Sequence, residues 1–556
     1  MRHLAALTLV ALALTGSPVR SQDANGAFAA LTARYFSEQW KLDPVAATEV
    51  GVHDYDSELA DYSAAAHELR VARAKRYLSE IAAIDSRALA PETGADYEIF
   101  KARLERTILD ETEAPQRWRH DPSVYTGVAA DAIYGLIERD FAPLAARMRF
   151  AIARERAIPS MLAAGATNIT TVNPTTAQIA RGNMAGAISF FSRDVPLAFA
   201  NVADSALQAQ FKSANDSVLV ALRDYIAKMS AGPLAHPSGT YALGAELFEK
   251  RLALQELTPI PLARYESVGE AALAKTKADF IATARKIDPA KPPEEVAAEL
   301  GRDHPSSDQL LGLAQRDLDQ LRSFVREKRL VTLAPDWDIV VTPTPEFDRE
   351  TSFASMDSPG PLEKVATKAF YYITTVDPSW SKERQEQHLA FFNNAYRPIV
   401  SAHEVMPGHY LNFALNKHQD LSMVRRLMGS PTFSEGWAHY DEQMIVDEGW
   451  GNGDPRVRLA MLQGALLREC RYLVGLREHT QGLSVADATK FFMANAFMQQ
   501  EPARREALRG TEDPLYGYYT LGKLEILKLR ADYQKKMGSG YSLQKFHDAL
   551  LAHGRP

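Results

Sequence analysis

The chain has 556 residues, of which 63 are lysine or arginine and 70 are aspartate or glutamate, giving a formal net charge of −7. This acidic balance leaves no excess of positive charge for phosphate binding, so nucleic acid is not an expected partner. The 46% of hydrophobic residues is typical of a folded globular protein. A single cysteine, Cys470, excludes an intramolecular disulfide and any metal site built from several thiolates. A metal ion would therefore have to be held by histidines and carboxylates.

The first 21 residues are typical of a secretory signal peptide. Arg2 is followed by an apolar run from Leu4 to Leu14, which is too short to span a bilayer. Cleavage after Ser21 fits the pattern, and neighbouring small residues offer other sites. No cysteine follows the apolar run in a position to carry a lipid. We therefore expect a periplasmic or secreted protein without a membrane anchor.

Residues 22–330 form the expected N-terminal helical region, and residues 331–556 the expected C-terminal catalytic region. Apolar residues recur at three- and four-residue steps in five long segments, which predicts amphipathic helices. These segments are Val71–Ile84, Tyr97–Leu109, Leu144–Leu162, Leu207–Met229 and Leu310–Leu330. Ser306 with Gln309 predicts a capping box, and Ser484 predicts another helix start. The expected fold class is mainly α, with Cys470 as a packing residue inside a helix.

Two short segments have the β-branched and aromatic composition of strands. They are Trp337–Thr342 and Phe370–Thr375, and both precede the residues that carry the chemistry. We expect a small sheet near the functional site. We also expect the free edge of Phe370–Thr375 to pair with the backbone of an extended substrate.

The segment SAHEVMPGHYLNF contains His403, Glu404 and His409, which are suited to a catalytic zinc site with a glutamate base. The two histidines are six residues apart. On a regular helix that spacing rotates the second side chain by roughly 600°, so the two rings would point about 120° apart. The helix must therefore deform to let both rings meet one ion. Pro407 and Gly408 supply the means, because proline removes a backbone donor and glycine accepts unusual dihedral angles.

Glu435, in the later segment PTFSEGWAHYDEQM, supplies the third ligand that a catalytic zinc ion requires. His439 follows four residues later on the same helical face. It either orients a ligand through a hydrogen bond or joins the ligand set, and we favour the first role.

Hydrolysis of an amide places negative charge on the former carbonyl oxygen, so a donor besides the metal is expected at the site. A glycine-punctuated turn offers three tyrosines for this role, Tyr516, Tyr518 and Tyr519.

Three sequence motifs, HEVMPGH, FSEGWAHY and YYTLGKLEILKLR, resemble the bacterial DUF885 family, which is similar to zinc metallopeptidases of the HExxH class. The resemblance implies a large helical metallopeptidase-like fold with a deep cleft and a small sheet near the metal site. It implies one Zn²⁺ per chain, held by His403, His409 and Glu435. It further implies that Glu404 is the general base and that Tyr519 is the catalytic tyrosine.

The residues and the resemblance together predict a zinc metallopeptidase that hydrolyses short peptides, of the oligopeptidase, carboxypeptidase or dipeptidase type. One alternative keeps the site and changes the substrate to a non-peptide amide or ester. Another is a non-catalytic helical binding protein with a structural metal. Two histidines and one carboxylate also suit iron, cobalt or manganese. The sequence makes no prediction of the oligomeric state, which stays unknown.

Overall fold

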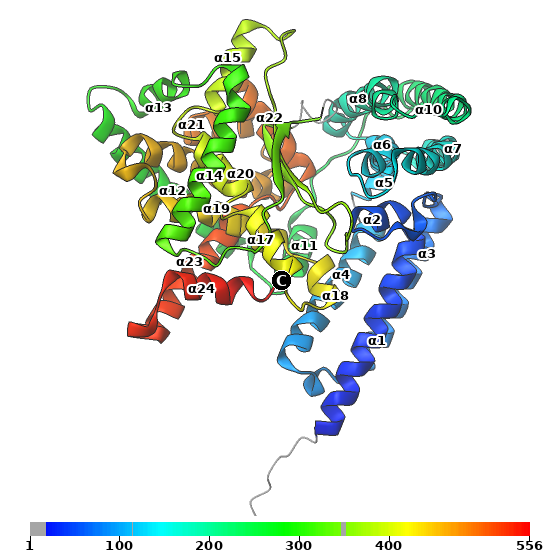
Figure 1. Cartoon of the computed structure of the whole chain (residues 1–556), viewed down its shortest axis with the longest axis horizontal. Helices are drawn as coiled ribbons and strands as arrows, with labels where there is room; N and C mark the ends of the chain where they lie inside the picture. Colours follow the sequence, from blue (N-terminus) through cyan, green and yellow to red (C-terminus); the bar gives the residue numbers. More distant parts are fainter. Residues whose placement is uncertain (1–17, 114, 346–351, 556) are drawn as a thin grey trace, which may run out of the picture.

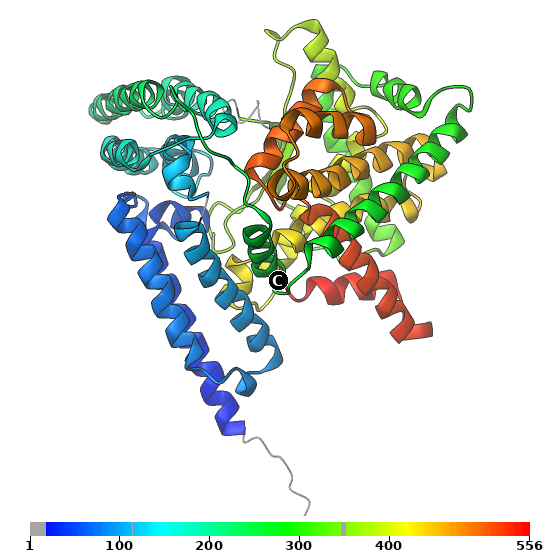
Figure 2. The ribbon, with the colours of Figure 1, turned by 180° about the vertical axis from the view of Figure 1, so that it is seen from behind.

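The computed structural model describes residues 18–113, 115–345 and 352–555. Figure 1 shows a small sheet in the middle of the molecule, with the N-terminal helices on one side and the remaining helices on the other. The reverse view in Figure 2 shows the same division. Residues 1–17 of the expected signal peptide lie outside the described residues.

The N-terminal helices enclose two separate hydrophobic cores. One core surrounds Tyr77 and Phe100, and the other surrounds Phe191 and Leu222. The α-helices that the structure describes here are α1 (Pro18–Leu42), α2 (Pro44–Glu49), α3 (Ala64–Ala82), α4 (Pro91–Thr112), α5 (Arg117–His120), α6 (Ser123–Ile137), α7 (Leu144–Asn168), α8 (Pro174–Ser189), α9 (Val195–Ala198) and α10 (Ser205–Ala231). The segments predicted from periodicity are all helical, and each overruns its helix by at most two residues.

Most helices from residue 245 onward share a third and larger core. They are α11 (Ala245–Glu256), α12 (Leu262–Ile287), α13 (Pro293–Arg302), α14 (Leu310–Lys328), α15 (Lys382–Phe391), α16 (Arg397–Glu404), α17 (His409–Lys417), α19 (Pro431–Asp447), α20 (Pro455–Thr480), α21 (Val485–Ala496), α22 (Gln500–Glu512), α23 (Tyr518–Met537) and α24 (Leu543–Leu551). The short helix α18 (Met423–Leu427) packs instead in the core around Tyr77 and Phe100. The larger core runs from Phe248 to Leu551 without a break at residue 330. The expected division of the chain at residue 330 stays a prediction.

Helix α20 is the central element of this core. Most of its residues from Leu459 to His479 are buried, including Cys470, because α12, α21 and α22 pack around it. Charged residues such as Arg468 and Glu469 interrupt its apolar surface. Among the described helices, none combines the length and apolar character needed to cross a membrane.

The sheet has three strands, β1 (Ile339–Pro343), β2 (Ala354–Asp357) and β3 (Ala369–Ile373), in the order β1-β3-β2. Strand β1 runs parallel to β3, and β2 runs antiparallel to it. The expectation that Phe370–Thr375 offers a free edge is therefore wrong, because β3 has a strand on each side. The missed strand is β2, whose sequence Ala-Ser-Met-Asp has little β-propensity and is held by its pairing with β3.

The two faces of β3 contact opposite halves of the molecule, because successive side chains in a strand alternate. The hydroxyl of Tyr371 lies 3.2 Å from the Ser401 hydroxyl in α16. The hydroxyl of Tyr372 donates to Glu138, after the end of α6, at 3.1 Å. The sheet thus separates the N-terminal helices from the helix that carries the HE motif.

The loop between β2 and β3 attaches the N-terminal helices to the sheet. The N–H of Leu362 donates to the Val50 carbonyl at 2.9 Å, beside the end of α2. A β-carbon on Gly360 would lie 2.3 Å from the Glu49 carbonyl oxygen, so the close approach of the two backbones requires glycine. His53 adds an ion pair to Glu363 in the same loop.

Candidate metal centre

The helix that carries the HE motif is broken where the sequence predicts. Helix α16 ends at Glu404 and α17 begins at His409. The N–H of Gly408 donates to the Ala402 carbonyl at 2.9 Å, six residues back instead of the usual four. Two extra residues are thereby inserted into the helical ladder. The insertion turns His409 back toward the face that carries His403, as the rotation argument requires.

Gly408 is required at this break. A β-carbon there would lie 1.8 Å from the carbonyl oxygen of His403, far inside van der Waals contact. The peptide bond between Met406 and Pro407 is cis. The indole Nε1–H of Trp437, in α19, donates to the Pro407 carbonyl at 3.0 Å. A tryptophan of the FSEGWAHY motif thus stabilises the loop of the HEVMPGH motif.

His403, His409 and Glu435 form a group that could hold a metal ion, since their ligand atoms all lie within 4.8 Å of one another. The Nε2 atoms of both histidines lie 3.4 Å from Glu435 Oε2. Two ligands about 2.0–2.1 Å from a tetrahedral zinc ion stand roughly 3.3–3.4 Å apart. Oε2 is also buried and has no hydrogen-bond partner in the described part of the chain, although buried polar atoms normally have one. The donor set therefore fits zinc.

Two glycines bring Glu435 and Tyr519 close together. Helix α19 crosses α23 where Gly436 faces Gly522, and a β-carbon on Gly436 would lie 2.5 Å from the Gly522 α-carbon. A β-carbon on Gly522 would lie 1.9 Å from the Thr432 carbonyl oxygen. The helices therefore approach more closely than side chains would allow.

Glu442 holds the ring of His403 from the side opposite Glu435. Its Oε1 lies 2.7 Å from His403 Nδ1 and 2.8 Å from a guanidinium nitrogen of Arg468. Burial alone would raise the pKa of Glu442, but Arg468 and two histidines hold it well below the usual value. Glu442 is therefore an ionised acceptor. It fixes a proton on Nδ1 of His403 and leaves Nε2 free to bind a metal.

His439 lies outside the group of three donors. Its Nδ1 is 3.3 Å from Glu442 Oε2, so it contacts the carboxylate that orients His403. Burial lowers the pKa of His439 to about 3, which keeps the ring neutral. The sequence reasoning missed Glu442, although Glu435, His439 and Glu442 follow helical spacing and share one face of α19.

Glu404 is half-buried next to the three donors and is not one of them. Within the described residues, no hydrogen bond or ion pair engages its carboxylate. Burial raises the pKa of Glu404, and the charges of His403 and His409 oppose that rise.

Of the three candidate tyrosines, Tyr519 is the one that packs against His403, with ring centroids 6.4 Å apart and planes at 27°. Burial raises the pKa of Tyr519, so its hydroxyl stays protonated. Tyr516 is fully buried, and its hydroxyl donates to a backbone carbonyl. Tyr518 donates to Asp513 at 2.9 Å.

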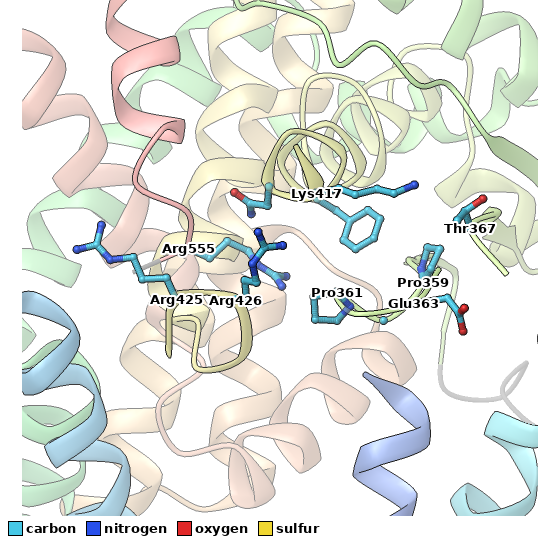
Figure 3. A pocket seen from close by; sticks show the side chains of 11 residues that line it. Pro359, Pro361, Glu363, Thr367, Lys417, Arg425, Arg426 and Arg555 are labelled. Carbon is cyan, nitrogen blue, oxygen red and sulfur yellow. The ribbon is translucent and has the colours of Figure 1, made fainter. Parts of the chain in front are cut away.

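The pocket in Figure 3 is separate from this centre. It lies between the far part of α17, helix α18 and the loop before β3, and its cavity of about 20 Å³ is near the size of one water molecule. Two of its three arginines are already engaged, because Arg425 donates to Asp96 in α4 at 2.7 Å and Arg426 donates to two backbone carbonyls. This region joins α4 to α18, and its cavity is too small for a peptide.

Comparisons with known proteins give a family and a fold. The model of a bacterial protein family of unknown function, DUF885, matches residues 44–556. No curated protein matches significantly. The structure of a candidate lipoprotein of unknown function from Shewanella oneidensis has a TM-score of 0.79 at 26% identity, covering 95% of this chain and 97% of that one. A candidate lipoprotein from Colwellia psychrerythraea has a TM-score of 0.73 at 18% identity, covering 96% of each chain, which shows a shared fold alone.

Proposed function

This chain belongs to the bacterial DUF885 family of unknown function, and we propose that it is a zinc-dependent peptidase of short peptides. The observation that carries the proposal is the position of Glu435 Oε2, 3.4 Å from the Nε2 atoms of both His403 and His409, with the unengaged Glu404 beside them. Structural zinc sites are closed by four protein ligands, whereas catalytic sites have three and an open position. The three donors and the adjacent Glu404 carboxylate match a catalytic site.

Glu404 is the proposed general base and acid. When bound, a zinc ion supplies a Lewis acid and lowers the pKa of water. Glu404 takes a proton from the water whose oxygen attacks the peptide carbonyl carbon. It then delivers that proton to the amine nitrogen as the carbon–nitrogen bond breaks. Burial raises the pKa of Glu404, and a raised pKa favours a carboxyl group that both accepts and releases a proton.

Two further residues prepare the site for this reaction. The protonated hydroxyl of Tyr519 is the proposed donor to the oxygen that gains negative charge. Glu442 accepts the Nδ1–H of His403 and so keeps that ring in the orientation and tautomer that a metal requires. Neither residue changes its covalent state during the cycle.

Strand β2 supports a peptide as the substrate. It is an edge strand of the sheet and lies against α16, the helix that carries His403 and Glu404. An extended peptide can add to such an edge through main-chain hydrogen bonds, largely independent of its side chains. The side chains of His409 and Glu435 are 19% and 24% exposed, so solvent reaches the centre. The deep cleft implied by the family resemblance is part of this proposal.

An envelope location is proposed on two grounds. The N-terminal residues have the pattern of a secretory signal peptide. The similar structure from Shewanella oneidensis, at 26% identity, is named as a candidate lipoprotein, and lipoproteins are proteins of the cell envelope.

The test is elemental analysis of the purified protein combined with two variants. We expect one zinc per chain, lost in His403→Ala and retained in Glu404→Gln. We expect hydrolysis of a randomised peptide pool by the parent and loss of that hydrolysis in both variants. Absence of metal after zinc is supplied would contradict the site, and full turnover by Glu404→Gln would contradict the glutamate mechanism. Hydrolysis of small amides or esters with no peptide cleaved would favour the non-peptide alternative.

A further inference from the structure

Three arginines surround the ring of Tyr519. The guanidinium carbons of Arg468, Arg471 and Arg509 lie 5.8, 5.2 and 5.9 Å from its centroid. Arginines packed this closely repel one another unless carboxylates neutralise them. The carboxylate partners of each arginine therefore show which guanidinium charge is not neutralised.

Two of the three arginines have tight carboxylate partners. Arg468 lies 2.8 Å from Glu442, the residue that holds His403. Arg471 makes two parallel hydrogen bonds to Glu506, at 2.7 and 2.8 Å. Both pairs are largely buried and hold the charge of their arginines within the fold.

Arg509 has no such partner. Among the described residues its nearest carboxylate oxygen is Asp513 Oδ2, at 3.7 Å, and that oxygen already accepts the Tyr518 hydroxyl at 2.9 Å. Arg509 also makes long hydrogen bonds to the hydroxyls of Tyr519 and Tyr518, at 3.3 and 3.5 Å. Its side chain is 40% exposed. A partly exposed, incompletely paired guanidinium thus stands beside the catalytic tyrosine of the proposed mechanism.

We propose that Arg509 binds the C-terminal carboxylate of the peptide, so that the enzyme removes one or two residues from the C-terminus. This inference rests on the peptidase function proposed above. A guanidinium offers two parallel donors that match a carboxylate, and the bonds are charge-assisted. The ring of Tyr519 is 6.4 Å from that of His403, and its hydroxyl is 3.3 Å from Arg509. Because a peptide residue spans about 3.3–3.6 Å, a terminal carboxylate bound beside Tyr519 belongs to a residue close to the cleaved bond.

The first experiment maps where peptides are cut. The zinc-loaded protein is incubated with a pool of N-acetylated peptides, in parallel with the same pool carrying C-terminal amides, and the products are identified by mass spectrometry. We expect cleavage one or two residues from a free C-terminus and little cleavage of the amides. Equal cleavage of both pools, or cuts in the interior, would overturn the assignment of Arg509 and leave the peptidase proposal standing. No cleavage in either pool would contradict the peptidase proposal itself and, with it, this inference.

The second experiment measures binding without turnover. One peptide that the parent cleaves is titrated, as acid and as amide, into the Glu404→Gln protein by calorimetry. We expect the acid to bind about 10–100-fold more tightly than the amide, as for the loss of a hydrogen bond to a charged group. Adding Arg509→Met should abolish the preference for the acid, and Arg509→Lys should restore part of it.

Arg504→Gln is the matched control, because Arg504 lies on the same helix, has the same 40% side-chain exposure and pairs with Glu501. The control should keep the full preference for the acid. Arg509→Met should bind the amide as tightly as the protein with Arg509 does. Such a result would mean that the weaker binding of the acid comes from the missing guanidinium and not from a displaced Tyr519. In the turnover assay the same variant should raise KM for the acid with kcat largely kept. A preference for the acid that survives Arg509→Met would overturn the proposal.

Discussion

Glu442 Oε1 lies 2.7 Å from His403 Nδ1, so a carboxylate on α19 fixes the ring of a proposed metal ligand on α16. We predict that Glu442→Gln lowers zinc affinity about 10–100-fold, as is typical for loss of a partner that orients a ligand. The amide can still accept a hydrogen bond, but it leaves the buried Arg468 without a counter-charge. Competition with a chromogenic chelator measures the change.

Asp447→Asn is the control for this variant. Asp447 lies on the same helix, and its ion pair with Arg458 is exposed. It should bind zinc like the parent. Unchanged affinity in Glu442→Gln would mean that the hydrogen bond to His403 does not organise the centre.

Gly408 gives a second prediction, because the α-hydrogen that a β-carbon would replace points at the backbone of His403. In Gly408→Ala the new carbon would lie 1.8 Å from the His403 carbonyl oxygen, so the loop must move. We expect the variant to lose most of its zinc and to unfold at a lower temperature. Gly186→Ala in α8 is the control, because a β-carbon there meets no atom of the described residues within 4 Å. That control should be unchanged or stabilised by about 0.5–1 kcal/mol. Normal zinc content in Gly408→Ala would contradict the steric argument.

The parts of the structure that depend on local pattern are predictable from the sequence. Amphipathic helices such as α14 follow from periodicity, and the break between His403 and His409 follows from the rotation of a helix. Strand β2 is not predictable in this way, because it depends on pairing with β3 rather than on its own residues. The incomplete pairing of Arg509 is not predictable from the sequence either, because it depends on how Arg468 and Arg471 pair with carboxylates in the folded protein.

The ion-pair cluster around His53 predicts a pH-dependent joint between the N-terminal helices and the sheet. His53 lies 3.0 Å from Asp56 and 2.9 Å from Glu363, and its ring stacks on Phe141. Burial alone would lower the pKa of His53, but the two carboxylates outweigh it and raise the pKa above the usual value. A raised pKa in the folded state means that the stabilisation is complete below about pH 6.5 and is lost as the pH rises through the folded value.

His53→Gln should therefore destabilise the protein by about 1.5–3 kcal/mol near pH 6, the usual contribution of hydrogen bonds to charged groups. The loss should shrink at high pH, where the wild-type ring is neutral too. Thermal unfolding of both proteins across this range measures the difference. An equal loss at low and high pH would assign the effect of His53 to packing on Phe141 and not to charge.

Replacing Glu155 should stabilise the folded protein, whereas the substitutions above destabilise it or weaken zinc binding. Its side chain is fully buried in α7, and neither carboxylate oxygen has a hydrogen-bond partner among the residues that the structure describes. Burial raises the pKa of Glu155 to about 9. Between about pH 4.5 and that value the folded state holds a proton that the unfolded state releases, so stability falls as the pH rises.

Glu155→Met removes this cost, and the gain should grow with pH to as much as about 3 kcal/mol at pH 7. The control Glu68→Met, at an exposed position of α3, should show no such trend. A gain for Glu155→Met that is the same at about pH 5 and pH 8 would show that Glu155 is not held protonated in the folded protein.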